Sequence, residues 1–431
     1  MGRHEGGVLT CCRLPVALCA LVLAGLGFFP RSALGQYRPP APLPQQPTPT
    51  PSPSGEGGAE AQQAAAPVRR VGWAWEPGLV LDGGWEQNIG FTRPSGPDDI
   101  FGALTVSLAR VRRGERSEFR LAASGVGYLY REVENRNRVD GFLTMAAQGP
   151  LSRRVDGRLS GSFSYAHTDS EGSLISSGVI LPLARTQTSG GETGLTWRAA
   201  ERTSVSLGGS GYYTQFETGP YLDTMYGIAT LNLSQRVSSR DNLMLSASYQ
   251  VTQDDLSTRR NPAYYAGYER RFGSSMRLEL SAGLARQENF STEGGTEDGP
   301  AFEPRWGFYG TAGLSGRVRR SSLSARYRRG PQPQIGLGTS EVTDAFTLGL
   351  THPLGRRIEL VGNGAVALRA SAVEAGAAQR LDWDLYFGAF SRLSSQLRLG
   401  VGYRFRRRDD PLGTIRNDRA TVSLVWGDRE R

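Results

Sequence analysis

Residues 396–408 read QLRLGVGYRFRRR and alternate strictly between two kinds of side chain. The apolar set is Leu397, Leu399, Val401, Tyr403 and Phe405. The basic or small set is Gln396, Arg398, Gly400, Gly402, Arg404, Arg406 and Arg408. Successive side chains of a β-strand point to opposite faces, so this period of two predicts a strand with one apolar and one basic face. Such a strand fits either a soluble sheet or a membrane barrel, and the rest of the chain must distinguish them.

The same alternation recurs from about residue 73 to the end of the chain, with no segment of helical period between. The clearest examples are DGRLSGSFSYAH (156–167), DNLMLSASYQVTQ (241–253), SMRLELSAGLARQ (275–287) and RLDWDLYFGAF (380–390). In each example, Leu, Phe, Tyr and Val share one face, while Ser, Arg, Asp or Glu fill the other. The sequence therefore predicts an all-β fold built from many similar strands.

The connections between these segments alternate between short and long. The short ones are RRGER (112–116), PLSRR (150–154), RAAER (198–202), VSSRD (237–241), FGSS (272–275), RRSS (319–322), PLGRR (353–357) and LSSQ (393–396). The longer ones include TRPSGPDD (92–99), VTQDDLSTRRNP (251–262), STEGGTEDGPAFEPRW (291–306) and RGPQPQIGLGTSEVTD (329–344). This alternation is typical of an antiparallel up-and-down outer-membrane β-barrel, with periplasmic turns and external loops. Segment counting predicts about 18 strands, with 16 as the alternative.

Soluble all-β folds fit these features less well. A propeller would repeat a blade motif, which this sequence lacks, and a sandwich seldom uses so many successive hairpins. An arginine facing lipid at the bilayer midplane costs about 2–4 kcal/mol. We therefore expect Leu399 and its apolar neighbours to face lipid, and Arg398, Arg404 and Arg406 to face the barrel interior.

The first 72 residues differ from the rest of the chain. Residues 1–35 combine early arginines with an apolar run, Leu14–Phe29, and end in Ala-Leu-Gly, which predicts a Sec-type signal peptide. All three cysteines lie in this segment, so the mature protein would contain no disulfide. Residues 36–72 are rich in Pro, Ala and Gln, which predicts a disordered periplasmic linker, either inert or bound to a partner. The barrel would then span residues 73–431.

The formal net charge of +9 comes from arginine, because the chain contains no lysine. We find no zinc-finger spacing and no basic helix, so we expect no nucleic-acid partner. The arginines expected to face the lumen are Arg120, Arg158, Arg277, Arg326, Arg328, Arg398, Arg404 and Arg406. Rings of arginine favour anions in a pore. Acidic residues share the same faces, namely Asp156, Glu279, Asp382 and Asp384, so pairing across strands is the alternative role.

The last segment, LRLGVGYRFRRRDDPLGTIRNDRATVSLVW (397–426), consists of an alternating strand, a charged Arg/Asp stretch and a final strand that ends in Trp426. This pattern resembles outer-membrane β-barrels associated with exopolysaccharide or exosortase gene systems. The expected strand number is similar to that of barrels that export surface polysaccharides. The resemblance implies passage of a polysaccharide across the outer membrane, with a periplasmic polysaccharide-export partner. The chain departs from the usual final strand because GDRER follows Trp426.

No catalytic, cofactor or metal site is predicted. His167 has Asp169, not a serine, at the spacing that shares a strand face, and His352 lies beside a short turn. The external segment 291–306 is acidic through Glu293, Glu297, Asp298 and Glu303. It is interpreted as a solvated loop, with cation binding near lipopolysaccharide as the alternative.

The external loop 168–187 is unusually apolar through Leu174, Ile175, Val179, Ile180 and Leu181. An exposed apolar cluster needs a cover, so we expect a constriction that folds into the lumen, or a hairpin that extends the wall.

The function that this sequence predicts is an outer-membrane pore for secretion of a surface polysaccharide. The alternatives are a general or anion-favouring diffusion porin, a barrel hydrolase and an adhesin-like surface protein. We expect no enzymatic activity. The partners expected are outer-membrane lipid, lipopolysaccharide, the barrel-assembly machinery and a periplasmic polysaccharide-export protein.

Overall fold

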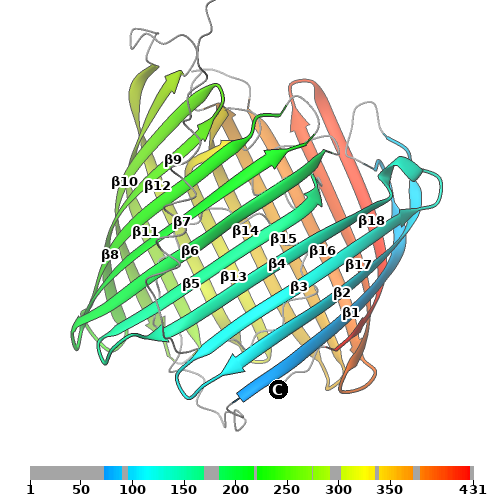
Figure 1. Ribbon diagram of the computed structural model, residues 1–431, viewed down its shortest axis with the longest axis horizontal. Helices are drawn as coiled ribbons and strands as arrows, with labels where there is room; N and C mark the ends of the chain where they lie inside the picture. The colour runs from blue at the N-terminus through cyan, green and yellow to red at the C-terminus, as the bar shows by residue number, and fades with distance from the viewer. Residues whose placement is uncertain are drawn as a thin grey trace, which may run out of the picture.

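The computed structural model describes residues 72–89, 96–168, 184–217, 221–273, 275–291, 302–334, 339–371 and 379–427. These ranges hold one short 3-10 helix, η1 (Glu134–Arg136), and eighteen long strands that lie inclined in Figure 1. The strands are β1 (Gly72–Glu86), β2 (Asp99–Arg113), β3 (Glu118–Tyr130), β4 (Arg138–Pro150), β5 (Val155–His167), β6 (Arg185–Ala200), β7 (Thr203–Phe216), β8 (Thr224–Arg236), β9 (Asp241–Asp254), β10 (Ser257–Phe272), β11 (Met276–Ser291), β12 (Phe302–Val318), β13 (Ser321–Gln334), β14 (Thr339–Leu354), β15 (Ile358–Ser371), β16 (Arg380–Arg392), β17 (Leu397–Asp410) and β18 (Gly413–Trp426).

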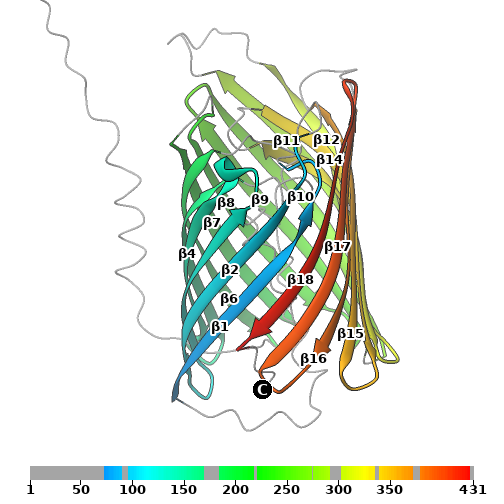
Figure 2. The same cartoon turned by 90° about the vertical axis from the view of Figure 1, so that its right-hand side faces the viewer.

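The eighteen strands form a closed antiparallel barrel. Each strand pairs with the next in the sequence, and β1 pairs with β18 from Leu79↔Trp426 to Glu86↔Arg419. Figure 2 shows this closing seam, where the first and last strands lie side by side. Closure leaves no sheet edge unpaired. The predicted all-β up-and-down barrel is confirmed, with 18 strands and not 16.

Short turns lie at one end of the barrel, the end that also holds the start of β1 and the end of β18 (Figure 1). All eight turns occur where the sequence predicts them. At the other end, two predicted loops are wrong. Residues 251–262 belong mostly to β9 and β10, with only 255–256 between them, and β13 and β14 extend into 329–344. The polar ends of these strands resemble loops in the sequence. Both faces of a strand can carry polar groups where the strand extends beyond the apolar outer band of the barrel.

The outer face of the barrel is apolar. Along β17, Leu399, Val401 and Tyr403 are exposed, while Arg398 before them and Arg406 after them are buried. Exposed aromatic side chains gather near the short-turn end, namely Trp73, Phe119, Trp197, Phe272 and Trp426. An apolar band with an aromatic girdle is what a barrel surrounded by lipid requires. In the described part of the chain, no helix is long and apolar enough to cross a bilayer.

The interior is packed at the long-loop end. Phe101, Val126, Tyr128 and Tyr130 from β2 and β3 form a buried apolar cluster with Ile89, which follows β1. These residues alternate along their strands with exposed apolar residues such as Leu129, so they lie on the inner face. The cluster fills part of the barrel mouth beside the β1–β18 seam.

Candidate functional site: the inner wall of the barrel

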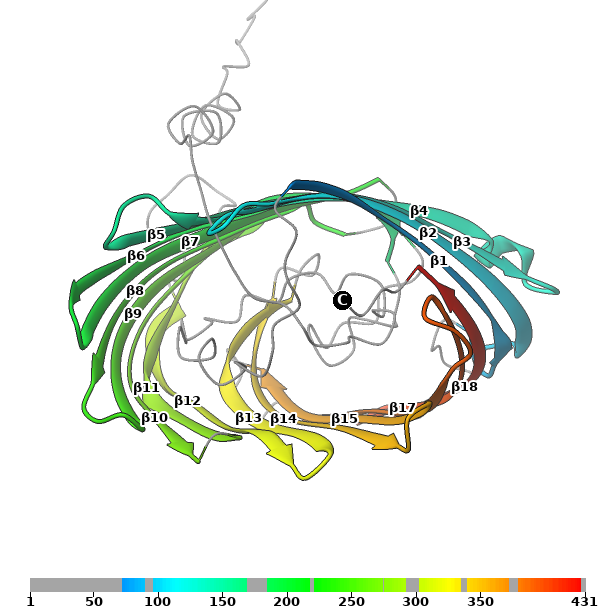
Figure 3. The same ribbon diagram turned by 90° about the horizontal axis from the view of Figure 1, so that it is seen from below.

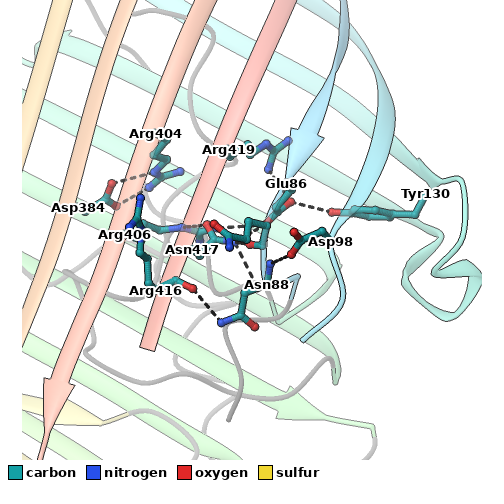
Figure 4. Close-up of polar contacts among 11 residues, drawn as sticks. Glu86, Asn88, Asp98, Tyr130, Asp384, Arg404, Arg406, Arg416, Asn417 and Arg419 are labelled. Carbon is teal, nitrogen blue, oxygen red and sulfur yellow. Dashed lines mark hydrogen bonds and ion pairs between the residues drawn. The ribbon is translucent and has the colours of Figure 1, made fainter. Parts of the chain in front are cut away.

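The inner wall carries buried ion-pair clusters from β13 round to β1, and a side that is richer in hydroxyl groups from β5 to β12, with ion pairs of its own on β10 and β11. At the seam, Glu86 is only 3% exposed. Its carboxylate accepts hydrogen bonds from Arg406 Nη2 (3.2 Å), Asn417 Nδ2 (3.0 Å) and the Tyr130 hydroxyl (3.2 Å). The Arg419 guanidinium lies 3.7 Å away. We call these five residues the seam cluster, and Figure 4 shows them converging from β1, β3, β17 and β18.

The seam cluster also holds the chain that leaves β1. Asn417 Nδ2 donates to the Gln87 carbonyl at 2.6 Å, and Asn88 Nδ2 donates to the Arg416 carbonyl at 2.8 Å. Asn88 has a φ of +50°, a conformation that Asn tolerates better than most residues. Its backbone N–H donates to Asp98, so the residue that precedes β2 is bound to Asn88, which is itself bound to β18 (Figure 4).

A second charged group surrounds Asp382 on β16. Its fully buried carboxylate accepts hydrogen bonds from Arg369 Nε at 3.0 Å and Arg408 Nε at 2.8 Å. Arg380 lies beside them and pairs with Glu341 at 2.8 Å. Asp384 lies two residues after Asp382 on β16. Arg404 binds both of its oxygens through Nε (2.8 Å) and Nη2 (2.6 Å). These contacts pair four arginines with three carboxylates along β14–β17.

The remaining predicted lumen arginines divide into paired and unpaired residues. Arg277 lies between Glu269 (3.0 Å) and Glu279 (2.8 Å), and Arg326 lies 3.6 Å from Glu279. Arg120 pairs with Glu76 at 2.9 Å. Arg398 is buried. Within the described ranges, Arg158 and Arg328 form no ion pair.

The predicted acidic partners are paired as well. Asp156 contacts Arg198, while Glu279, Asp382 and Asp384 have the partners given above. The structure thus favours the pairing role for most of the arginines.

The β5–β12 side of the wall is rich in hydroxyl groups. Hydroxyls pair across neighbouring strands at Thr188–Thr214 (3.2 Å), Thr196–Ser206 (3.0 Å) and Ser281–Thr311 (2.7 Å), and Ser246 donates to Asn232 at 2.6 Å. This side offers hydroxyl groups that can hydrogen-bond a solute.

Four tyrosines, which we call the inner tyrosines, project from this side: Tyr212 (β7), Tyr226 (β8), Tyr265 (β10) and Tyr309 (β12). Tyr212 and Tyr226 stack at 6.4 Å between ring centroids with 27° between planes, and Tyr265 and Tyr309 stack at 6.0 Å with 18°. A pocket beside the second pair is lined by Met244, Ser246, Tyr265, Glu279, Ser281, Tyr309 and Thr311. None of these tyrosines is among the residues predicted to face the lumen. Each tyrosine lies at one of the alternating positions that polar or small residues otherwise fill, as Tyr212 does after Ser206, Gly208 and Ser210. That alternation in the sequence places the tyrosines on the inner face.

His167 contacts a carboxylate other than the one considered in the sequence, and His352 lies near a short turn, as the sequence indicates. His167 Nδ1 lies 2.8 Å from buried Asp140 on β4, and Asp169 lies outside the described residues. His352 Nδ1 lies 2.8 Å from the Ser321 hydroxyl near a short turn. In the described part of the chain, neither imidazole contacts both a hydroxyl and a carboxylate, and no three acidic, His or Cys residues could hold a metal ion.

Two predicted features lie outside the residues whose side chains are described. One is the proposed constriction, Leu174, Ile175, Val179, Ile180 and Leu181. The other is the acidic group Glu293, Glu297, Asp298 and Glu303.

Neither a protein-family model nor a curated protein sequence matches this chain. The chain is similar to several solved structures. OpdO of Pseudomonas aeruginosa is 13% identical, with 82% of this chain and 96% of that chain covered and a TM-score of 0.44. OccK2 (OpdF) of the same organism is 12% identical, with 82% and 97% covered and a TM-score of 0.46. A BenF-like porin from Pseudomonas fluorescens Pf-5 is 10% identical, with 82% and 98% covered and a TM-score of 0.44.

Proposed function

We propose that this protein is an outer-membrane channel through which small hydrophilic solutes diffuse. The observation that carries the proposal is the opposite character of the two faces of the same strands. Leu399 and Val401 on β17 are exposed and apolar, while hydroxyls, tyrosines and paired charges line the inner face. Lipid demands the first surface, and an aqueous path demands the second.

The arginine pairing bears on which kind of channel this is. An anion-selective pore presents arginines without acidic partners to the solute. Here Glu86, Glu279, Asp382 and Asp384 neutralise most of the inner arginines. A general diffusion channel with only a weak preference for anions therefore fits this wall better than an anion filter.

Secretion of a surface polysaccharide is the second candidate function. The hydroxyl-rich side of the wall favours it, because a neutral polymer of sugars needs hydrogen-bonding groups and aromatic surfaces more than charge. The resemblance of residues 397–426 to exopolysaccharide-associated barrels points the same way. Lipopolysaccharide contacts, the barrel-assembly machinery and a periplasmic export protein belong to this proposal as partners.

Liposome swelling tests the primary function. We expect liposomes that contain the folded barrel to swell in small sugars, at rates that fall as the sugar becomes larger. The control is the same protein kept unfolded in urea and added at the same concentration. A folded and inserted barrel that passes no sugar and carries no current in planar bilayers would contradict the proposal.

Deletion of the gene in its host separates the two candidates. A diffusion channel predicts slower uptake of small hydrophilic solutes with normal surface polysaccharide. An export conduit predicts loss of surface polysaccharide and its accumulation in the periplasm, which would overturn the primary proposal.

A further inference from the structure

Two exposed arginines, Arg110 and Arg112, lie on the outer face of β2 near the short-turn end. They occupy the same alternating positions as the exposed Leu104, Val106 and Leu108, so they extend that apolar column toward the turn. Within the part of the chain that the structure describes, neither guanidinium forms an ion pair with a carboxylate. Their charges therefore remain available to a ligand that approaches from the membrane.

Arginines elsewhere on the outer face have acidic partners. Three examples are Arg270 with Asp241 (3.6 Å), Arg329 with Asp344 (2.5 Å) and Arg416 with Asp418 (2.6 Å). In these pairs a carboxylate of the chain itself offsets the positive charge. The outer face of β2 has no such carboxylate beside its two arginines, and it is positively charged at this level.

Aromatic rings on the neighbouring strands hold the two guanidinium groups in place. In the strand register, Arg112 lies between Trp73 on β1 and Phe119 on β3, and Trp75 lies opposite Arg110. The Arg110 guanidinium carbon lies 4.4 Å from the ring centroid of Trp73 and 5.2 Å from that of Trp75. A ring contacts the flat face of a guanidinium and leaves the N–H groups at its edge free to bind an anion.

The arginines lie at one edge of the apolar band. The distance from Ile100 to Arg110 is about 34 Å along the strand. A strand tilt of about 40° reduces this length to about 26 Å along the membrane normal, which matches the apolar band of about 25 Å around outer-membrane barrels. The guanidinium groups are therefore level with the lipid phosphates of one leaflet. Figure 3 looks at the barrel from this end and shows β1, β2 and β3 side by side in the wall.

The chemistry of these residues indicates which lipid fits. A guanidinium binds a phosphate through two parallel N–H···O bonds. Two unpaired guanidinium groups about 7 Å apart on one strand face attract a headgroup with net negative charge and repel the ammonium of a zwitterionic headgroup. Trp73 and Trp75 suit the boundary between headgroup and acyl chain, and Leu108 continues the apolar surface beyond them.

We propose that Arg110 and Arg112, held against Trp73 and Trp75, form a binding site for an anionic phospholipid. The lipid belongs to the periplasmic leaflet, because the short turns of such barrels face the periplasm. The two arginines bind the headgroup phosphate, and an acyl chain follows the column that begins at Leu108. The site concerns the lipid around the barrel, so it is independent of the solute that passes through the lumen.

Native mass spectrometry of the folded barrel tests this proposal with phosphatidylglycerol and phosphatidylethanolamine that carry the same acyl chains. We expect the wild type to bind phosphatidylglycerol more tightly. Arg110→Gln/Arg112→Gln should weaken that binding about fivefold for each arginine, or about thirtyfold in total, and should change phosphatidylethanolamine binding much less. Arg110→Lys/Arg112→Lys keeps the charge without the parallel hydrogen bonds, so its affinity should lie between those of the wild type and the glutamine variant.

Two further variants separate this site from a general effect of charge. Arg407→Gln/Arg416→Gln is the matched control, because these outer-face arginines lie opposite each other on β17 and β18 and each has a carboxylate partner. It should bind phosphatidylglycerol as the wild type does. Trp73→Leu/Trp75→Leu keeps an apolar surface but removes the rings that hold Arg110, and it should weaken the binding by about twofold to fivefold.

Heat-modifiable migration shows that each variant is folded before its lipid binding is measured, and the single variants Arg110→Gln and Arg112→Gln replace a double variant that does not fold. Equal affinity of the wild type for the two lipids, or undiminished binding of phosphatidylglycerol by the glutamine variants, would overturn the proposal. Displacement of the lipid by an equal concentration of inorganic phosphate would indicate a simple anion site instead. A preference for lipid A over phosphatidylglycerol would contradict the assignment to the periplasmic leaflet. Because none of these measurements depends on conductance, the channel function is tested separately.

Discussion

Glu86 shows how much one carboxylate can contribute to closing a barrel. It is buried between β1 and β18 and satisfies donors on three strands. Removing one partner of a buried ion pair typically costs about 3–5 kcal/mol, because the other charge remains buried without compensation. We therefore expect Glu86→Leu to lower the free energy of unfolding by that amount, measured by urea titration of the barrel refolded in detergent micelles.

Glu76 supplies the control for this prediction. It pairs with Arg113 at 2.6 Å and with Arg120 at 2.9 Å, but its side chain is 34% exposed. Exposed ion pairs contribute about 0–1 kcal/mol. Glu76→Leu should therefore have a small effect, and equal losses for the two variants would show that the seam cluster is not a buried ion-pair network.

Leu399 tests the assignment of the outer face. Leu399→Arg places a charge in lipid and should destabilise the inserted barrel by about 2–4 kcal/mol relative to Leu399→Ala. The measurement is the yield of heat-modifiable, protease-resistant protein in outer membranes. Similar yields for the two variants would place this residue away from lipid.

At this scale, alternation in the sequence predicts which way a side chain faces but not what it contacts. Arg398, Arg404 and Arg406 could be placed on one face from the period alone. The partners of Glu86 are Arg406 and Asn417, which lie 320 and 331 positions along the chain. Only the closing register of β1 with β18 brings them together, and no local pattern encodes that register.

At the scale of elements, strand ends depart most from the prediction, and the β9–β10 hairpin shows why. Arg259 is buried and pairs with buried Asp254 across the tight connection at 255–256. The polar stretch 251–262 resembles a loop in the sequence. In the structure its side chains pair with each other, and β9 and β10 continue through it. Arg259→Leu should open this hairpin tip, seen as faster amide hydrogen exchange in residues 252–260, whereas Gln253→Ala, exposed on the other face, should not. Unchanged exchange in Arg259→Leu would mean that the backbone ladder alone holds the tip.

The short turns were well predicted because their chemistry is local, as the turn between β8 and β9 shows. Asp241 accepts hydrogen bonds from the Ser238 hydroxyl and the Tyr268 hydroxyl, each at 2.6 Å, and these bonds hold the pKa of Asp241 below its ordinary value of 3.8. A carboxylate whose pKa is lower in the folded state stabilises that state above its ordinary pKa, and this contribution is lost as the pH falls through the lowered value.

Asp241→Asn should therefore unfold at a lower urea concentration than the wild type at pH 7. The difference between the two proteins should shrink as the pH falls below about 4. A difference that stays constant over this pH range would show that the ionised form of Asp241 does not stabilise the turn.

For the whole molecule, strand number and closure could be predicted from the sequence, but the shape of the lumen could not. The stacking of Tyr265 on Tyr309 depends on Gly283 lying between them in the sheet, and the three residues meet only through the register of β10, β11 and β12. The tyrosines also alternate with apolar residues in the same way whether they line an open pore or meet across it. Curvature is a property of the closed sheet, and the sequence pattern carries no signal for it.

The balance of charge within this lumen leads to a prediction about ion selectivity. Glu279 lies between Arg277 and Arg326, beside the inner tyrosines, so its carboxylate offsets positive charge in this part of the inner wall. We expect the wild-type channel to prefer chloride over potassium only weakly, because most inner arginines are paired. Glu279→Gln removes the carboxylate partner of Arg326, while Arg277 keeps Glu269, and should raise the chloride preference. Arg326→Gln should lower it. Reversal potentials in a KCl gradient measure both shifts, and Arg407→Gln, an exposed arginine paired with Asp409 near the β17–β18 turn, is the control. Strong chloride selectivity that Glu279→Gln leaves unchanged would mean that the arginines select anions in spite of their carboxylate partners.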